Sequence, residues 1–106
     1  NIFCIVDANN RTILGDLDKT YPNIDLKNNF NSLGFDVHEI NGHNMNEIHE
    51  LFENLLNKET DRPNMIYAKT IKGKGIDFME ESHLWHNRMP TNTQLDEAIK
   101  NLQSEI

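Results

Sequence analysis

The sequence predicts an α/β protein built on a parallel sheet, with its elements in βαβαβα order. Three short apolar runs rich in β-favouring residues alternate with three amphipathic helical patterns along the 106 residues. The first run is continuously apolar, which is typical of a strand covered on both faces. Strands that alternate with helices form parallel sheets through right-handed crossovers. Ligands of such sheets bind beyond the carboxyl ends of the strands, so the segments that follow the three runs are the candidate functional segments.

The apolar runs predict strands at residues 2–6, 35–40 and 65–68. The first run begins one residue after the start of the chain, which does not open with Met. We therefore expect further upstream sequence, supplied either by another chain or by a longer form of this one.

The first helical pattern has an N-cap candidate in Asp25 and a stop signal in Gly34. The second and third patterns open on pairs that resemble capping boxes, Asn44 with Glu47 and Thr91 with Gln94. Apolar residues at helical spacing predict the face that each helix buries in the core. These residues are Leu26, Phe30 and Leu33 in the first pattern, Met45, Ile48, Leu51, Phe52, Leu55 and Leu56 in the second, and Leu95, Ala98, Ile99 and Leu102 in the third.

The composition limits the classes of partner. A formal net charge of -7 argues against nucleic acid or an anionic membrane as the main partner. No apolar run approaches membrane-spanning length, and the single cysteine excludes an internal disulfide, which fits a cytoplasmic protein. The positive charge is nevertheless concentrated at Lys69, Lys72 and Lys74, so a local phosphate pocket remains compatible with the acidic chain.

Carboxylate and amide side chains follow the first strand, at Asp7 and Asn9. Such groups commonly cap a turn. Alternatively, the Asn9 side chain and the backbone carbonyl two residues on, at Arg11, offer two of the oxygen ligands that Mg²⁺ prefers. The segment lacks a second well-placed carboxylate, so a magnesium site formed here would be incomplete.

Gly42 and His43 follow the second strand, where the histidine is expected to be structural and the start of the next helix could face an anion. A Lys-Gly-Lys-Gly stretch at residues 72–75 follows the third strand. Its flexible backbone and clustered charge suit a phosphate or diphosphate, although a solvated basic turn is the competing interpretation. The glycine spacing excludes a Walker loop.

Two histidines, His83 and His86, lie three residues apart beyond the lysine-rich stretch. The spacing alone permits a metal site, but no cysteine or third histidine is nearby, which disfavours zinc. Imidazoles that contact phosphate or move protons fit better beside a lysine cluster.

These segments together resemble the transketolase family. The matching segments are VDANN at residues 6–10, INGHN at 40–44, AKTIKGKGIDFME at 68–80 and WHNRMP at 85–90. They occur in the family's order and spacing, over essentially the whole chain. The resemblance implies that residues 1–106 are the C-terminal portion of a diphosphate-binding domain, with a partial transketolase-like fold. It also implies thiamine diphosphate as cofactor, held through Mg²⁺ or another divalent cation such as Ca²⁺ or Mn²⁺.

The resemblance also assigns roles to individual residues. Asn9 matches the asparagine that binds the metal through its side chain, and Arg11 stands where a backbone carbonyl completes the metal shell. Lys72 matches a lysine of the cofactor and substrate channel. His86 matches a histidine that contacts the diphosphate and the sugar phosphate, and His83 stands where some members place a second histidine. Lys72 and His86 are therefore the catalytic candidates.

The sequence departs from the family pattern at several positions. Asn87 replaces a glycine after the Trp-His pair, Thr12 or Ile13 stands where many members carry a polar residue near the cofactor, and Arg11 is unusually polar for its place. These differences bear on the acceptor preference and on the activity itself.

The resemblance implies a split or partial transketolase of the pentose phosphate pathway that moves a two-carbon ketol unit between sugar phosphates. Its expected partners are an upstream segment with a metal-binding Gly-Asp-Gly signature and a pyrimidine-binding domain with the activating glutamate, in a homodimer or heterotetramer. Two alternatives remain open. One is a related thiamine enzyme, of the deoxyxylulose-phosphate synthase or dihydroxyacetone synthase type, and the other is a non-catalytic assembly module.

Overall fold

The computed structural model describes residues 2–104, which form two compact units. The first unit contains residues 2–8 and Asn23–Thr70, and the second contains Asn9–Pro22 and residues 71–104. Within residues 2–104, no helix has the length and apolar character needed to cross a membrane.

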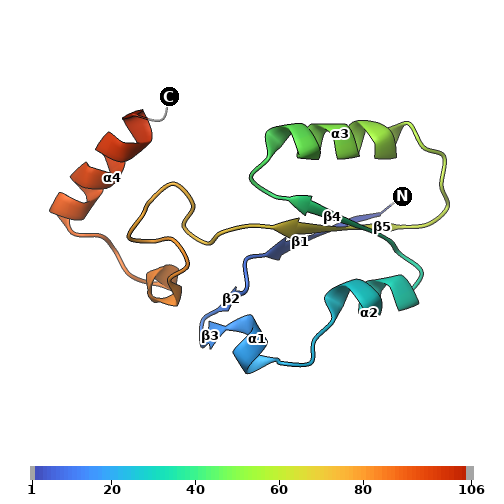
Figure 1. Cartoon of the computed structure of the whole chain (residues 1–106), viewed down its shortest axis with the longest axis horizontal. Helices are drawn as coiled ribbons and strands as arrows, with labels where there is room; N and C mark the ends of the chain where they lie inside the picture. The colour runs from blue at the N-terminus through green and yellow to red at the C-terminus, as the bar shows by residue number, and fades with distance from the viewer. Residues whose placement is uncertain (1, 105–106) are drawn as a thin grey trace. The chain divides into compact units, whose positions relative to one another are not determined.

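The first unit is built on a parallel sheet of three strands, β1 (Phe3–Ala8), β4 (Asp36–Asn41) and β5 (Asn64–Lys69). The strand order is β1-β5-β4, so β5 is central (Figure 1). Both outer strands end level with the central one, because Ala8 and Asn41 are each paired with Lys69. The predicted parallel α/β fold is confirmed, and the three strands do end at one edge of the sheet.

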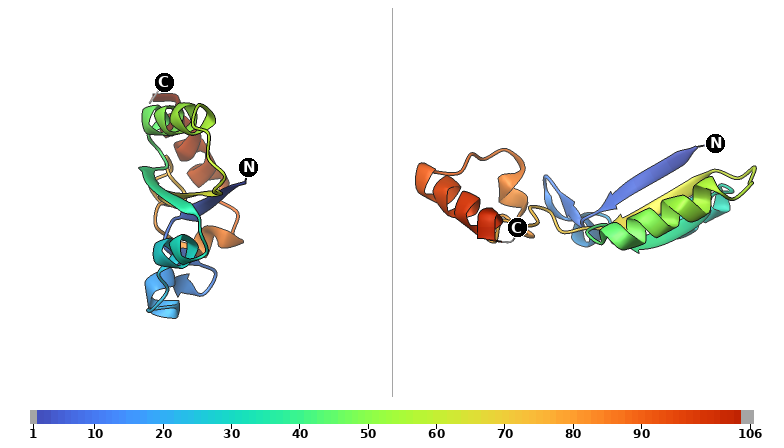
Figure 2. Two further views of the ribbon diagram at one scale, coloured as in Figure 1. Left: turned by 90° about the vertical axis from the view of Figure 1, so that its right-hand side faces the viewer. Right: turned by 90° about the horizontal axis from the view of Figure 1, so that it is seen from above.

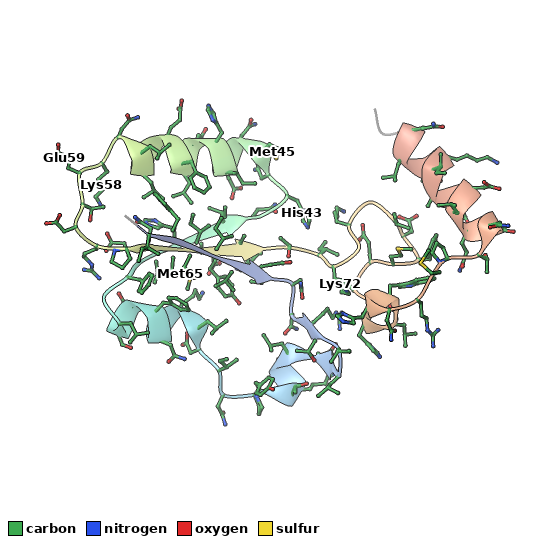
Figure 3. The ribbon with its side chains drawn as sticks, turned by 180° about the vertical axis from the view of Figure 1, so that it is seen from behind. His43, Met45, Lys58, Glu59, Met65 and Lys72 are labelled. Carbon is green, nitrogen blue, oxygen red and sulfur yellow. The ribbon has the colours of Figure 1, made fainter. Side chains whose placement is uncertain are left out.

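Two helices cover opposite faces of this sheet, α2 (Leu26–Ser32) and α3 (Met45–Leu56) (Figures 1 and 2). The central strand between them carries the core, since the side chains of Asn64, Met65 and Ile66 are at most 1% exposed. Met65 lies in the middle of this unit in Figure 3. Rings of Phe3 and Phe52 pack with centroids 5.9 Å apart between β1 and α3.

The predicted N-caps of α2 and α3 are confirmed, whereas the capping box predicted for α3 is only half formed. The Asp25 carboxylate accepts a hydrogen bond from the Asn28 backbone N–H at 3.1 Å, which caps α2. The Asn44 side-chain oxygen accepts from Glu47 N–H at 3.3 Å and caps α3. Glu47 does not complete a standard capping box, because its carboxylate accepts instead from the backbone N–H of Asn41, at 2.9 Å.

Three residues of the core faces predicted for the first two helices are instead exposed. Leu33, Met45 and Leu56 keep 72–73% of their surface in water. Leu33 is the C-cap of α2, so the helical period no longer sets its direction. Met45 and Leu56 are the first and last residues of α3, and a terminal residue has a neighbouring helical turn on one side only.

The second unit begins with a small hairpin that the sequence did not predict. Strands β2 (Arg11–Thr12) and β3 (Gly15–Asp16) pair antiparallel and lead into a single turn of helix, α1 (Leu17–Thr20). The Thr12 hydroxyl donates to the Gly15 carbonyl at 3.1 Å and accepts from Leu14 N–H at 3.2 Å. Strands of two residues carry no recognisable hydrophobic period, which is why this hairpin escapes sequence analysis.

The second unit ends with a 3₁₀ turn, η1 (His83–His86), and with helix α4 (Asn92–Ser104). The predicted capping box is confirmed: Thr91 Oγ1 accepts from Gln94 N–H at 3.3 Å, and Gln94 Oε1 accepts from Thr91 N–H at 3.0 Å. On the predicted apolar face only Ala98 is buried. Leu95, Ile99 and Leu102 remain 41–47% exposed.

Candidate functional site

The second unit contains a cavity of about 230 Å³ that collects most of the predicted site residues. The segment after β1 and the segment after β5 both contribute to its walls. The lining residues are Asn9, Arg11, Thr12, Ile13, Lys72 and His86. His83 lies on the same 3₁₀ turn as His86 but is exposed and does not line this cavity.

Asn9 is held in one orientation by its own backbone neighbourhood. Its side-chain oxygen accepts a hydrogen bond from Arg11 N–H at 2.8 Å, which closes a tight turn through Asn10 at a φ of 53°. An amide oxygen has two lone pairs, and this turn uses one of them. The turn interpretation and the metal-ligand interpretation of Asn9 are therefore compatible, since the turn fixes the oxygen while leaving it a second lone pair.

The oxygen donors at this cavity fit only part of a magnesium shell. Mg²⁺ requires near-octahedral oxygen coordination. Within residues 2–104, no group of three His, Cys, Asp or Glu side chains is placed to hold a metal ion. Asn9 and the Arg11 carbonyl are hard oxygen donors, but none of the lining residues in the described part of the chain is a carboxylate. The remaining ligands of any metal bound here would be water molecules, groups outside the described residues, or oxygens of a phosphate ligand.

Lys72 begins a loop that is closed by its own backbone. The Lys72 carbonyl accepts from Glu81 N–H at 3.0 Å, and Met79 N–H donates to the Ile76 carbonyl at 2.7 Å within the loop. Gly73 has a φ of 80°, and a Cβ added there would lie 2.6 Å from the Met79 carbonyl oxygen. The glycine of this motif is therefore required by the close approach of the two sides of the loop.

The three lysines that the sequence groups together have different partners. Lys69 contacts Glu39, and Lys74 lies 3.2 Å from the Glu80 carboxylate, so both charges are offset within the chain. Lys72 is half-buried and lines the cavity. The sequence predicted a cluster of positive charge, whereas the structure directs one lysine of the three to the site.

His86 is positioned by an anchored neighbour. Trp85 donates from its indole N–H to the Phe78 carbonyl at 2.7 Å, and its ring packs on Phe78 with centroids 5.2 Å apart. The Ser82 hydroxyl accepts from Leu84 N–H at 3.3 Å and starts the 3₁₀ turn. Because Trp85 is tied down, the next residue, His86, is presented at the cavity while remaining exposed.

The carboxyl edge of the sheet in the first unit is tightly packed. The Thr70 hydroxyl donates to the Asp7 carboxylate, which joins the ends of β5 and β1. Gly42 donates its N–H to the Lys69 carbonyl at 2.7 Å, and a Cβ on Gly42 would lie 2.5 Å from the Thr70 methyl group. His43 forms part of the same turn, because its N–H donates to the Asn41 side chain at 3.0 Å.

Glu39 on β4 lies between two lysines, Lys27 of α2 and Lys69 of β5. Hydrogen bonds from Lys27 and then Lys69 lower the pKa of Glu39 from 4.5 to about 2. The same contact with Glu39 raises the pKa of Lys27. This group ties a helix to two strands and is structural.

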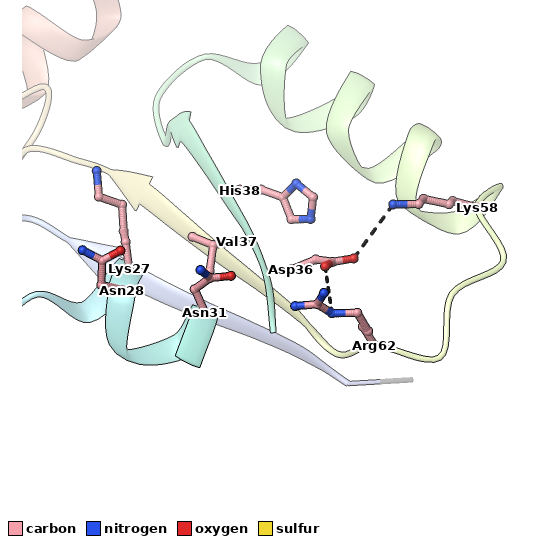
Figure 4. A pocket seen from close by; sticks show the side chains of 8 residues that line it. All are labelled: Lys27, Asn28, Asn31, Asp36, Val37, His38, Lys58 and Arg62. Atoms are coloured by element: carbon pink, nitrogen blue, oxygen red, sulfur yellow. Dashed lines mark ion pairs between the residues drawn. The ribbon is translucent and has the colours of Figure 1, made fainter. Parts of the chain in front are cut away.

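A larger cavity, of about 520 Å³, lies in the first unit beside β4 (Figure 4). Its cationic residues are engaged by the chain itself. Arg62 donates from Nε to the Asp36 carboxylate and to the Gly34 carbonyl, both at 3.0 Å, and from Nη2 to the Phe35 carbonyl at 3.2 Å. Lys58 also faces Asp36, at 3.9 Å. The charged residues that line this cavity therefore form a structural ion-pair cluster at the start of β4.

The comparisons with known proteins agree with the fold and the motifs. Residues 1–103 match the family model of the transketolase, thiamine diphosphate binding domain. The chain belongs to this family. The crystal structure of transketolase from Campylobacter jejuni superposes with a TM-score of 0.73 and 28% identity, over 99% of this chain and 20% of that one.

Two curated transketolase subunits align over nearly the whole chain. An apulose-4-phosphate transketolase component from Phocaeicola vulgatus is 29% identical over 106 residues, which is 100% of this chain and 37% of that protein. The 6-deoxy-6-sulfo-D-fructose transketolase component SqwG of Clostridium sp. (strain MSTE9) is 30% identical over 105 residues, which is 99% of this chain and 38% of that protein. The chain thus spans well under half the length of these transketolase relatives.

The interactions of the Arg11 side chain were not predicted from the sequence of this transketolase domain. Its guanidinium contacts Asp16 on β3 and lies 3.7 Å from the Glu81 carboxylate. The unusual polarity of position 11 is compatible with a charged partner for its side chain. Glu81, however, belongs to no motif that would identify it as that partner. Only the folded loop brings the two residues together.

Proposed function

We propose that this chain is part of a transketolase-type transferase that moves a two-carbon ketol unit between a ketose phosphate and an aldose phosphate. The observation that carries the proposal is the shared cavity of Asn9, Arg11, Lys72 and His86 in a chain of this family. Thiamine diphosphate, when bound, would supply the carbon nucleophile that carries the two-carbon unit. The contribution of this chain is binding, orientation and electrostatics.

Asn9 and the Arg11 carbonyl would hold a divalent cation, Mg²⁺ or alternatively Ca²⁺ or Mn²⁺. Support comes from the orientation of the Asn9 side-chain oxygen, which accepts a hydrogen bond from Arg11 N–H with a donor–acceptor distance of 2.8 Å. A ligand oxygen that is already oriented loses little freedom on binding. The cation would neutralise the diphosphate charge next to these oxygens.

Lys72 and His86 would contact anionic oxygens of the cofactor diphosphate and of the substrate. A lysine ammonium supplies a point charge, and an imidazole can donate a hydrogen bond or move a proton near neutral pH. The backbone of Lys72 is held by the hydrogen bond from Glu81 N–H to its carbonyl, at 3.0 Å. His86 follows Trp85, whose indole N–H is anchored on the Phe78 carbonyl. Preorganised charges of this kind stabilise anionic oxygens at low reorganisation cost. His83 remains a secondary candidate for cofactor contact.

The substrates would be anionic sugars. One relative is named for apulose-4-phosphate and another for 6-deoxy-6-sulfo-D-fructose. A phosphate and a sulfonate both present tetrahedral anionic oxygens, which Lys72 and His86 can bind. Sugar phosphates of the pentose phosphate pathway are the class proposed for this chain.

The activity would require partner segments. Both of these relatives are named as subunits of a transketolase, and each name therefore implies a further polypeptide in that enzyme. The partners proposed here are an upstream segment with the Gly-Asp-Gly signature, which would add a carboxylate to the described lining of the cavity, and a pyrimidine-binding domain. The assembly would be a homodimer or heterotetramer in the cytoplasm.

The decisive experiment is a titration of the native assembly with thiamine diphosphate at fixed Mg²⁺, followed by a ketol-transfer assay. Replacing Asn9→Ala should weaken cofactor binding on the order of tenfold or more, because even indirect metal contacts are worth that much. Asn9→Asp, which restores an oxygen ligand, should recover most of the affinity. Equal affinity in wild type and Asn9→Ala would remove Asn9 from the metal shell.

The same assembly separates the enzyme from the alternatives. Two-carbon transfer that depends on Lys72 and His86 supports a transketolase. Condensation of pyruvate with glyceraldehyde phosphate would indicate a deoxyxylulose-phosphate synthase, and transfer to formaldehyde a dihydroxyacetone synthase. Cofactor-independent assembly without any transfer would indicate a non-catalytic module.

A further inference from the structure

The Arg11 side chain joins the two sequence segments that line the cavity. It is 19% exposed, and its guanidinium contacts the Asp16 carboxylate within its own hairpin. Its second terminal nitrogen lies 3.7 Å from the carboxylate of Glu81, which is at the far end of the loop that Lys72 begins. All three residues belong to the second unit.

The contact between Arg11 and Glu81 also restrains Lys72, because Glu81 is hydrogen-bonded to the Lys72 backbone. Glu81 N–H donates to the Lys72 carbonyl at 3.0 Å, so whatever holds Glu81 also holds the backbone of Lys72. Glu81 has a φ of 55°, a conformation that costs a non-glycine residue free energy and persists only where its surroundings maintain it. The Arg11 guanidinium is one such restraint.

Arg11 also fixes the opposite wall of the cavity. Its backbone N–H donates to the Asn9 side chain at 2.8 Å. One residue therefore orients Asn9 through its main chain and restrains the Lys72 loop through its side chain. A planar guanidinium suits this position, because its fork of donors can engage two carboxylates at once.

The charges around Arg11 argue against a direct role in anion binding. Asp16 and Glu81 both face the guanidinium, and Asp16 also faces Lys19 at 2.5 Å. The positive charge of Arg11 is thus already offset by carboxylates of the chain. Its geometry suits holding two segments together.

We propose that Arg11 is a positioning residue that clamps the Lys72 loop to the hairpin that carries Asn9, and so sets the spacing of the cofactor-binding cavity. The proposal deepens the function proposed above and rests on it for the identity of the ligand. It also gives a structural reason for the polar side chain at position 11.

The test compares Arg11→Met with Lys19→Met in the native assembly. Both variants remove one cation that faces Asp16, but only Arg11 also reaches Glu81. Methionine keeps the length and the backbone carbonyl of position 11. The Arg11–Glu81 contact is long, at 3.7 Å, and its carboxylate is exposed, so its loss in Arg11→Met should speed amide exchange of residues 72–82 by about two- to fivefold. Lys19→Met should leave that exchange unchanged.

Two further variants keep the test decisive if Arg11→Met folds poorly. Glu81→Gln should speed exchange of residues 72–82 as much as Arg11→Met, and the double variant should add nothing beyond either single one. Arg11→Lys should fall between wild type and Arg11→Met, because a single ammonium cannot bridge both carboxylates. Exchange in β5, in the other unit, serves as the control for folding.

Cofactor affinity decides whether the clamp positions the site. At saturating Mg²⁺, Arg11→Met and Glu81→Gln should both weaken thiamine diphosphate binding by about two- to fivefold, the effect expected of one long ion pair with an exposed carboxylate, while Lys19→Met should not. Unchanged exchange in Arg11→Met would overturn the clamp. Faster exchange with unchanged affinity would overturn the positioning role, and weaker binding in Arg11→Met alone would make Arg11 a direct ligand. No cofactor binding by wild type would refute the proposed function, while the exchange data would still decide the clamp.

Discussion

Gly73 offers the sharpest test of how the Lys72 loop is built. The residue has a φ of 80°, and a Cβ at this position would lie 2.6 Å from the Met79 carbonyl oxygen and 2.7 Å from the carbonyl carbon. Real Cβ atoms essentially never approach another atom closer than 3.0 Å. Because the obstructing atoms are backbone, no side-chain rotation can relieve the contact.

The expected cost of Gly73→Ala has two parts. A left-handed conformation costs an L-residue about 1–2 kcal/mol. The backbone clash adds a further penalty, of about 1–3 kcal/mol by analogy with overpacked sites. The sum is about 2–5 kcal/mol, and even 2 kcal/mol corresponds to about a thirtyfold increase in the population of the open loop.

Two matched glycines separate these two parts. Gly75 has a φ of 90°, but its Cβ would meet only the movable end of the Leu102 side chain, at 3.2 Å. Gly34 has a φ of 91° with nothing within 4 Å. Alanine at either position should therefore cost about 1–2 kcal/mol from the backbone conformation alone.

Native-state amide exchange provides the measurement. Exchange of residues 72–82 should rise far more in Gly73→Ala than in Gly75→Ala, and Gly34→Ala should affect only the end of α2. Thiamine diphosphate affinity should fall in the same order for the two loop variants. If Gly73→Ala exchanges no faster than Gly75→Ala, the close approach of Gly73 to Met79 does not exist in solution and the loop closure described above is wrong.

Three further changes have defined outcomes. Lysine contacts lower the folded-state pKa of Glu39 to about 2 from 4.5, so its stabilisation is present above pH 4.5 and lost as pH falls toward 2. The urea midpoint of wild type should thus be higher than that of Glu39→Gln at pH 6, and the difference between the two midpoints should be smaller at pH 3.5. A difference in midpoint that does not change with pH would contradict this. Gly42→Ala should lower stability by about 1–3 kcal/mol, because its Cβ would lie 2.5 Å from the Thr70 methyl group. Adding Thr70→Ser, which removes that methyl, should restore much of the urea midpoint, and no recovery would place the strain elsewhere. Thr91→Ala should cost about 1 kcal/mol by removing the acceptor of the Gln94 N–H, seen as faster exchange in the first turn of α4. Unchanged exchange there would show that the cap contributes nothing.

Regular elements were predictable because each has a local cause in the sequence. The three strands follow from apolar runs bounded by polar residues, and the structure places all three within two residues of the expected ends. Asp25, Asn44 and Thr91 cap helices as predicted, because a cap depends on residues within one turn. The short hairpin at Arg11–Asp16 was missed, because nothing in two-residue strands repeats.

The structure brings four of the five predicted site residues together. Asn9, Arg11, Lys72 and His86 line one cavity, while His83 lies outside its lining, and the metal and cofactor roles of all five remain proposals. The three lysines of the predicted cluster have different partners: Lys69 pairs with Glu39, Lys74 pairs with Glu80, and Lys72 lines the cavity. Whether a charge is offset depends on carboxylates such as Glu39 and Glu80, which reach it only through the fold.

The sequence by itself determined the fold class, the helix caps and the family, because these depend on short-range periodicity and on motifs in fixed order. The tertiary structure alone decided the strand order β1-β5-β4, the partner of each charge and the contact between Arg11 and Glu81. Those features join residues far apart in the chain, and their energies depend on distances that no local pattern encodes. The polarity of position 11 therefore reads as an anomaly in the sequence, and its contacts with Asp16 and Glu81 are visible only in the folded chain.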